Sequence, residues 1–356
     1  MKKLKHKNIL LRNEALMRKI RRSKIKRKEL NIQRNKYNPN KLRYQKPNKY
    51  KNVVEEITID AGTKFALFDD PEGVIELIQK IDRYKKVSRY LKKIFIDLSH
   101  IVLIDIAAIN ILLAKINEIS KVKRLYISGN MPKEKGCHEL FEKSGFLDYM
   151  VDLSGKKFAQ KSLNFLLNIG ADKTLNEKIG RSIEKSMKFI TGTEQKYPPV
   201  YSIVQEMCSN SIEWANSKNS RNKNWLLGVQ LDTTNHEPVV NYALTDIGYG
   251  ILNTVHRKLG TKIIENIGNI SDIEILNRIF EKHYGSKSKE PNRNKGMPLI
   301  KDRLNNEYIC NLRVLTNHVL LNFCNEESSK VLNRNFPGTF YFWSINKKCL
   351  EKWTHK

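Results

Sequence analysis

The sequence predicts an α/β protein in which two domains follow a basic N-terminal tail, and three observations predict it. The 356 residues carry a net charge of +28, and residues 1–51 contribute +18 of it, with 20 Lys/Arg against Glu14 and Glu29. The rest of the chain, with 45 bases and 35 acids, is nearly balanced and has room for about two domains. In it, apolar runs typical of strands alternate with stretches of helical periodicity.

Composition excludes several classes of protein. A hydrophobic content of 40% is too high for a wholly disordered chain. The longest apolar stretch, 101–114, is interrupted by Asp105 and Asn110, whereas a membrane span needs about 20 largely apolar residues. The N-terminus lacks the apolar segment of a secretory signal. The five scattered Cys form no CxxC pair, which argues against a disulfide framework or a zinc site and favours a reducing, cytoplasmic location.

The tail, residues 1–51, is expected to be partly disordered or helical. Residues 8–36 contain no Pro or Gly, but their apolar positions follow no clean period. Clustered Lys/Arg side chains release counterions from phosphates, and Tyr37, Tyr44 and Tyr50 could stack on bases. A solvated tail, a nucleic-acid-binding arm and a segment attracted to an anionic membrane surface are therefore the three readings that the sequence leaves open.

The first predicted domain spans residues 52–155. Asp70-Pro71 is typical of a helix start, with an N-cap followed by Pro at the first helical position. Ser144-Gly145 suits a helix end, because glycine favours the C-terminal cap. Strands are expected over 56–60, 64–68, 94–98 and 125–128, and helices over 70–84, 106–116 and 139–143.

The stretch IFIDLSHIVLIDIAAINILLAKI and the following RLYISGNMPKEKGCHELFEKSGFLDYM resemble a STAS domain, the fold of anti-sigma-factor antagonists. Asp97, Ser99 and Asp105 match the family pattern, which implies a regulatory α/β domain that contacts a protein partner. The family opens the next helix with serines after the aspartate, one of which is phosphorylated. Here Ile106 and Ala107 stand in their place, so phosphorylation at that turn is not expected.

A helical connector is expected over 156–195, with one helix over 178–190, and a second domain over 196–350. In the second domain, apolar residues at helical spacing begin at Val200, and Glu206 and Asn210 share a different face of that helix. Strands follow over 225–231 and 239–245, and the second strand runs into Asp246-Ile-Gly248-Tyr-Gly250. Two alternate glycines after a strand mark a turn where the backbone comes close to another group.

The ordered set of motifs resembles the GHKL superfamily of ATPases, which includes gyrase, histidine kinases and MutL. Four segments carry the resemblance, and they occur in the order of the family. They are Glu206-Met-Cys-Ser-Asn210, Asp246-Ile-Gly248-Tyr-Gly250, Lys295-Gly296-Met-Pro-Leu-Ile300 and Gly338-Thr339-Phe340. The resemblance implies a Bergerat-type α/β sandwich in which helices pack on one face of a mixed sheet, with ATP and Mg²⁺ as ligands and a mobile lid around 285–300.

The resemblance implies a role for each matching residue at the phosphate end. Asn210 would hold the Mg²⁺ ion that bridges the phosphate oxygens, and Glu206 would be the general base. The amides near Gly296 would cradle phosphates, with Arg293 and Lys295 as charge partners.

At the adenine end, the resemblance implies that Asp246 accepts a hydrogen bond from the adenine amino group. Gly248 and Gly250 would let the backbone approach the base, and Thr339 would support the adenine contact. Pro298 departs from the family pattern, since it stands where a second glycine is common and lacks an N–H donor for phosphate.

The function that these observations predict is an Mg-ATP-binding ATPase or kinase-like switch, whose lid ordering signals to the STAS-like domain or to a protein partner. The sequence leaves two alternatives open. One is a serine kinase of the anti-sigma-factor type, which would need an acceptor serine on a partner. The other is a non-catalytic nucleic-acid-binding module that uses the basic tail. Hydrolysis, phosphotransfer and binding alone are not distinguished by the sequence.

Overall fold

The structure is a computed structural model, which divides the chain after Asn52 and forms one compact unit from Val53 to Lys356. It describes residues 54–86, 91–120, 125–150, 165–169, 175–214, 224–232, 237–259, 270–281 and 296–354. The tail, with its expected helix and its nucleic-acid or membrane readings, lies outside these residues, as do Arg293 and Lys295. We call residues 54–150 the N-terminal lobe and residues 165–354 the C-terminal lobe.

The N-terminal lobe is built on a parallel sheet of β1 (Val54–Asp60), β3 (Leu91–Asp97) and β5 (Tyr126–Gly129), in the order β1-β3-β5. A separate two-stranded sheet is formed by the parallel strands β2 (Lys64–Phe65) and β4 (Leu103–Ile104). The helical elements are α2 (Pro71–Lys86), α3 (Ile106–Ser120), α4 (Lys135–Lys143) and η1 (Phe146–Tyr149).

The helix boundaries of this lobe follow from capping chemistry. The Asp70 side chain accepts a hydrogen bond from the Gly73 amide at 2.9 Å, so the predicted start of α2 is confirmed. Gly145 has φ 84°, as expected for a residue that ends α4. Helix α4 begins earlier than expected, because the Glu134 carboxylate accepts from the Cys137 amide at 2.6 Å and caps it there.

The strand expected over 64–68 is shorter in the structure. After Phe65 the chain turns toward α2, and the Asp70 amide donates to the Ala66 carbonyl at 2.8 Å. The turn uses the backbone groups that a longer strand would have paired, so β2 ends after two residues.

The C-terminal lobe contains a five-stranded sheet in the order β6-β7-β8-β10-β9. Its strands are β6 (Phe165–Ile169), β7 (Asn224–Asp232), β8 (Val239–Asp246), β9 (Cys310–Asn322) and β10 (Lys330–Ile345). The helical elements are α5 (Asn176–Thr191), α6 (Pro198–Trp214), α7 (Ile251–Leu259), α9 (Asp272–Phe280), α10 (Gly296–Asn305), η3 (Glu326–Ser328) and α11 (Lys347–Thr354). All four pairings among the strands that the structure describes in this sheet are antiparallel, so the expectation of a mixed sheet was wrong for them.

The described parts of the segment expected as a connector, 165–169 and 175–195, belong to the body of the C-terminal lobe. Strand β6 pairs with β7 over all five of its residues and forms one edge of the sheet. Helix α5 packs against α6 and the sheet through Ile179, Ile183 and Met187, which are buried in the same cluster as Val204. The strand escaped the sequence analysis because four apolar residues and one asparagine show no decisive period.

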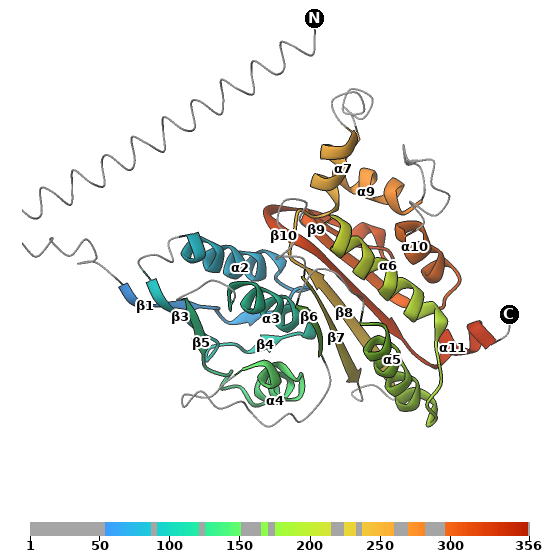
Figure 1. Cartoon of the computed structure of the whole chain (residues 1–356), viewed down its shortest axis with the longest axis horizontal. Coiled ribbons are helices and arrows are strands. Elements are labelled where there is room, and N and C mark those ends of the chain that lie inside the picture. The colour runs from blue at the N-terminus through green and yellow to red at the C-terminus, as the bar shows by residue number, and fades with distance from the viewer. Residues whose placement is uncertain are drawn as a thin grey trace, which may run out of the picture. The chain divides into compact units, whose positions relative to one another are not determined.

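The five-stranded sheet is covered on both faces, as Figure 1 shows. Helices α5 and α6 cover one face, while α2 and α3 of the N-terminal lobe cover the other. Side chains that point to the N-terminal lobe join its core, among them Leu226, Ala243, Leu315 and Phe340. The two lobes therefore share a hydrophobic layer within the compact unit from Val53 to Lys356.

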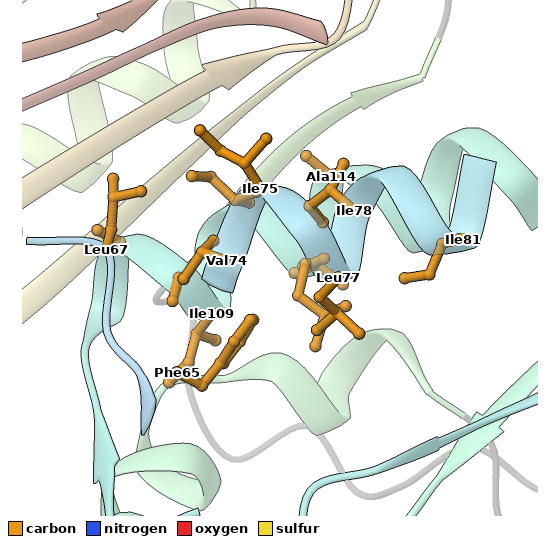
Figure 2. Close-up of a cluster of buried hydrophobic side chains, with 14 of the residues drawn as sticks. Phe65, Leu67, Val74, Ile75, Leu77, Ile78, Ile81, Ile109 and Ala114 are labelled. Carbon is orange, nitrogen blue, oxygen red and sulfur yellow. The ribbon is translucent and has the colours of Figure 1, made fainter. Parts of the chain in front are cut away.

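Figure 2 shows the buried apolar side chains of α2 in this hydrophobic cluster. Its apolar residues recur every three or four positions and are fully or almost fully buried. They are Val74, Ile75, Leu77, Ile78 and Ile81. Polar contacts surround the layer: Arg334 of β10 donates to Glu76 of α2 at 2.8 Å, and the Asn333 amide donates to Glu72 at 2.6 Å.

No helix among the described residues is both long enough and apolar enough to span a bilayer.

Candidate functional site

Helix α6 positions Glu206 and Asn210. It begins at Pro198-Pro199, where the fixed φ of proline suits the first helical turn. Its apolar positions, including Ile203 and Met207, are fully buried against the sheet, as the spacing predicted. This anchoring leaves Glu206 and Asn210, which are one helical turn apart, on a half-buried face toward the first residue of α10.

Gly296 brings the start of α10 against that face. A Cβ atom at this position would lie 2.7 Å from Glu206 Oε2 and 3.2 Å from Asn210 Nδ2, so a side chain would collide with the carboxylate. Glycine therefore allows the N-terminus of α10 to approach two polar side chains. The first amides of a helix have no partner within the helix and favour an anion nearby.

Asn210 has an unusual environment. Its Nδ2 atom is buried and makes no hydrogen bond, which is rare for a buried polar atom in a folded protein. Rotating the amide by 180° would present Oδ1 at the same place, where it could bind a cation. Among the described residues, no group of three His, Cys, Asp or Glu could hold a metal. A metal here would therefore need ligand oxygens from a bound anion, as is usual for Mg²⁺ with phosphates.

Asp246 ends β8 and is 7% exposed. The Thr339 amide donates to its Oδ1 atom at 3.2 Å, and burial raises the pKa of this carboxyl to about 7. Thr339 lies directly opposite Asp246 in the pairing of β10 with β8. Gly338 and Thr339 both lie inside β10.

Gly338 explains how the two strands meet at this point. It has φ 141°, and a Cβ atom there would lie 2.0 Å from the Asp246 carbonyl oxygen. Only glycine fits such a close backbone approach. Gly338 therefore allows the backbone of β10 to lie close to that of Asp246.

The loop after Asp246 contains the two predicted glycines and leads into α7. Gly248 lies in the turn, and Gly250 has φ 77°. A Cβ atom on Gly250 would lie 2.5 Å from Asn317 Oδ1. The side chains of Thr316 and Asn317, on β9, therefore approach the loop closely.

Tyr341 and Met297 connect the two ends of the site. The Tyr341 hydroxyl donates to Met297 Sδ at 3.5 Å, and Met297 directly follows Gly296 in α10. Burial raises the pKa of Tyr341 well above its usual value, and the nearby Asp246 charge adds to the effect. Tyr341 and Met297 thus link the group around Glu206 with the group around Asp246.

The structure brings together most of the predicted site residues. Glu206, Asn210 and Gly296 form one group, while Asp246, Gly250 and Thr339 form the other. The sequence analysis missed Thr316, Asn317 and Tyr341. The weak signal was Asn317 itself, since asparagine is uncommon inside a strand of apolar and β-branched residues.

The STAS-like residues have structural roles in the N-terminal lobe. Asp105 accepts from the Ala108 amide at 2.7 Å and caps α3, and burial raises its pKa to about 6. Asp97 accepts from the Ser99 amide at 2.9 Å, and the hydrogen bonds from Ser99 lower its pKa to about 2. Ile106 and Ala107, which follow Asp105 in the chain, are buried.

No protein-family model, no curated protein and no solved structure matches this chain in the comparisons with known proteins.

Proposed function

We propose that the C-terminal lobe binds Mg-ATP as GHKL ATPases do, and that it works as an ATPase or kinase-like switch. One observation carries the proposal: Gly296 lies against Glu206 and Asn210, although about 90 residues separate them in the chain. Three residues from two of the motifs identified for an ATP site thus meet at a helix N-terminus. Asp246 and Thr339, two further motif residues, are hydrogen bonded to each other.

In this proposal the phosphates lie between α6 and the start of α10. The N-terminal amides of α10 would favour their negative charge. Asn210 would bind Mg²⁺ through Oδ1, and the ion would neutralise charge on the phosphate oxygens. Glu206 would orient the attacking water or hydroxyl, because its carboxylate is on the same helix face as Asn210.

The adenine lies at the other end, against Asp246. The carboxyl group is buried, so a hydrogen bond to the amino group of the base would form with little competition from water. Thr339 keeps the carboxyl group in place through its amide. Pro298, in the first turn of α10, offers no amide to the phosphates. In this proposal the phosphates therefore have one amide donor fewer than the family pattern supplies.

Calorimetry of Mg-ATP binding tests the proposal with the variant Asn210→Ala. We expect the affinity to fall about tenfold or more, because a ligand to a charged group is lost. Gln205→Ala is the matched control, since it removes an amide side chain from the same helix, where the exposed Gln205 donates to Asn176 Oδ1 at 2.9 Å. Unchanged Mg-ATP affinity in Asn210→Ala, or no binding by the unmodified protein, would contradict the proposal.

A further inference from the structure

Asn317 adopts a backbone conformation that strands rarely contain. It lies within β9, is 3% exposed and has φ 53°. Opposite it, the pairing of β9 with β10 shifts: Phe336 pairs with Asn317, but Thr339 pairs with Thr316, so two extra residues of β10 are accommodated. A left-handed residue in a strand carries a conformational cost that the surroundings must offset.

The Asn317 side chain offsets that cost by binding the loop after Asp246. Its Oδ1 atom accepts from the amides of Leu252 at 3.1 Å and Asn253 at 3.4 Å, while Nδ2 donates to the Tyr249 carbonyl at 2.9 Å. Leu252 and Asn253 belong to the first turn of α7, whose amides have no partner within the helix.

Thr316 completes this arrangement. Its hydroxyl accepts from the Ile251 amide at 2.8 Å. Gly250, directly before α7, has no side chain with which to cap the helix, and β9 supplies the cap from 65 residues away. A side chain on Gly250 would collide with the Asn317 amide. The second glycine of the Asp-x-Gly-x-Gly motif thus makes room for Asn317.

The same polar cluster reaches Asp246 from the other side. Thr316 Oγ1 lies 3.4 Å from Thr339 Oγ1, and the Thr339 amide donates to Asp246. The loop is therefore held at its start by Thr339 and at its end by Thr316 and Asn317. All three residues are buried.

We propose that Asn317 is a positioning residue that sets the Asp246–Gly250 loop for recognition of an adenine base. This inference rests on the proposed function of the C-terminal lobe. Asn317 would not touch the nucleotide. It would act by fixing the loop, and with it the direction in which the Asp246 carboxyl group faces the base.

Base selectivity is the property that such a residue controls. A carboxylate set for the amino group of adenine rejects guanine, which presents a carbonyl oxygen at the same position. The test measures dissociation constants for Mg-ATP and Mg-GTP by calorimetry in the full chain. A general folding defect lowers the active fraction equally for both nucleotides and leaves their ratio unchanged.

The variants are Asn317→Ala and Asn317→Gly, with Asn311→Ala as the matched control. Asn311 also lies on β9 with positive φ, at 56°, but its side chain approaches Ser344, away from the loop. Asn317→Gly removes the same side chain, and glycine adopts a positive φ without strain. This variant therefore keeps the test possible if Asn317→Ala does not fold.

We expect both Asn317 variants to weaken Mg-ATP binding about tenfold and to bring the ATP-to-GTP ratio close to one. Asn311→Ala should keep the ratio of the unmodified protein. If folded Asn317→Gly keeps that ratio, the positioning role is overturned while the proposed function stands. If the unmodified protein binds neither nucleotide, both are overturned.

Discussion

Asn110 of α3 and Thr245 of β8 are joined by a hydrogen bond, in which the threonine hydroxyl donates to the asparagine Oδ1 atom. Asn110 also donates to the Ala243 carbonyl at 3.1 Å, and its side chain is fully buried. Thr245 directly precedes Asp246 in the chain. The N-terminal lobe is thus bonded to the strand that carries the acid of the candidate site.

The first prediction concerns the stability of this contact. Asn110→Ala should reduce the free energy of unfolding by about 2–3 kcal/mol, because it leaves buried polar partners unsatisfied and opens a small cavity. Urea unfolding monitored by circular dichroism measures the loss. Gln79→Ala serves as the control, since its hydrogen bond to the Asn335 carbonyl joins the same two lobes at an exposed position. A loss no larger than that of the control would contradict the prediction.

A double-mutant cycle sharpens the same prediction. Replacing both partners with apolar groups of similar shape, Asn110→Leu with Thr245→Val, should cost less than the sum of the single changes. Additive losses would show that the two side chains do not interact.

The second prediction concerns Gly296. Gly296→Ala places a methyl group 2.7 Å from the Glu206 carboxylate, so the Glu206 side chain must leave its position or the start of α10 must shift. We expect Mg-ATP affinity, measured by calorimetry, to fall by about tenfold or more. Gly180→Ala is the matched control, because Gly180 lies inside α5 with open space around it. That change should leave binding intact and raise stability by about 1 kcal/mol.

The third prediction concerns the pH dependence of stability. The folded pKa of Asp246 is about 7, against an ordinary value of 3.8, because burial disfavours the charged form. Between about pH 4 and pH 7 the folded protein keeps a proton that the unfolded chain has lost. Stability should therefore fall as the pH rises through this window, by on the order of 4 kcal/mol in total from this group.

Asp246→Asn isolates that contribution. Asparagine stays neutral and can still accept from the Thr339 amide, so the variant should lack this decline. The pKa of Asp105 is also raised, to about 6, so this group lowers stability as the pH rises toward 6. Both proteins contain Asp105, and its contribution cancels when their stabilities are compared. Urea unfolding at several pH values measures the difference. Parallel curves for the two proteins would refute the assignment.

The fourth prediction concerns Gly338. Gly338→Ala should destabilise the fold by roughly 3 kcal/mol or more, since its Cβ atom would lie 2.0 Å from the Asp246 carbonyl oxygen. Gly62→Ala provides the comparison, because Gly62 also has positive φ, at 77°, but no atom lies within 4 Å of the place its Cβ atom would take. It should cost only about 1–2 kcal/mol for its backbone conformation. Thermal unfolding distinguishes the two, and equal losses would contradict the steric argument.

Much of the secondary structure could be predicted from the sequence where a local cause sets it. The helix start at Asp70 and the helix end at Gly145 follow from caps that lie within a few residues of the boundary. The pairing of β6 and the packing of α3 on the sheet have no such local cause. The apolar run over 225–229 indicates burial on both faces, but it does not say which helices provide it.

The same distinction between local and long-range causes applies to the residues of the candidate site. Glu206 and Asn210 share a helix, so their spacing alone predicts that they are neighbours. The role of Asn317 depends on a positive φ in a strand and on hydrogen bonds to residues about 65 positions away. The residue types in the sequence identify neither the positive φ of Asn317 nor these long-range hydrogen bonds. The arrangement arises only when β9 and α7 meet in the folded chain.

The helices that cover the two faces of the five-stranded sheet come from different lobes. This arrangement limits which fragments of the chain can be produced separately and which can be exchanged between proteins. A fragment that starts at residue 196 would lack the edge strand β6 and helix α5, and Phe340 and its neighbours would face water. The N-terminal lobe alone would expose the matching surface of α2 and α3. Fragments intended to carry a single activity should therefore begin near residue 53, and exchange of either lobe between proteins would require a partner with the same apolar surface.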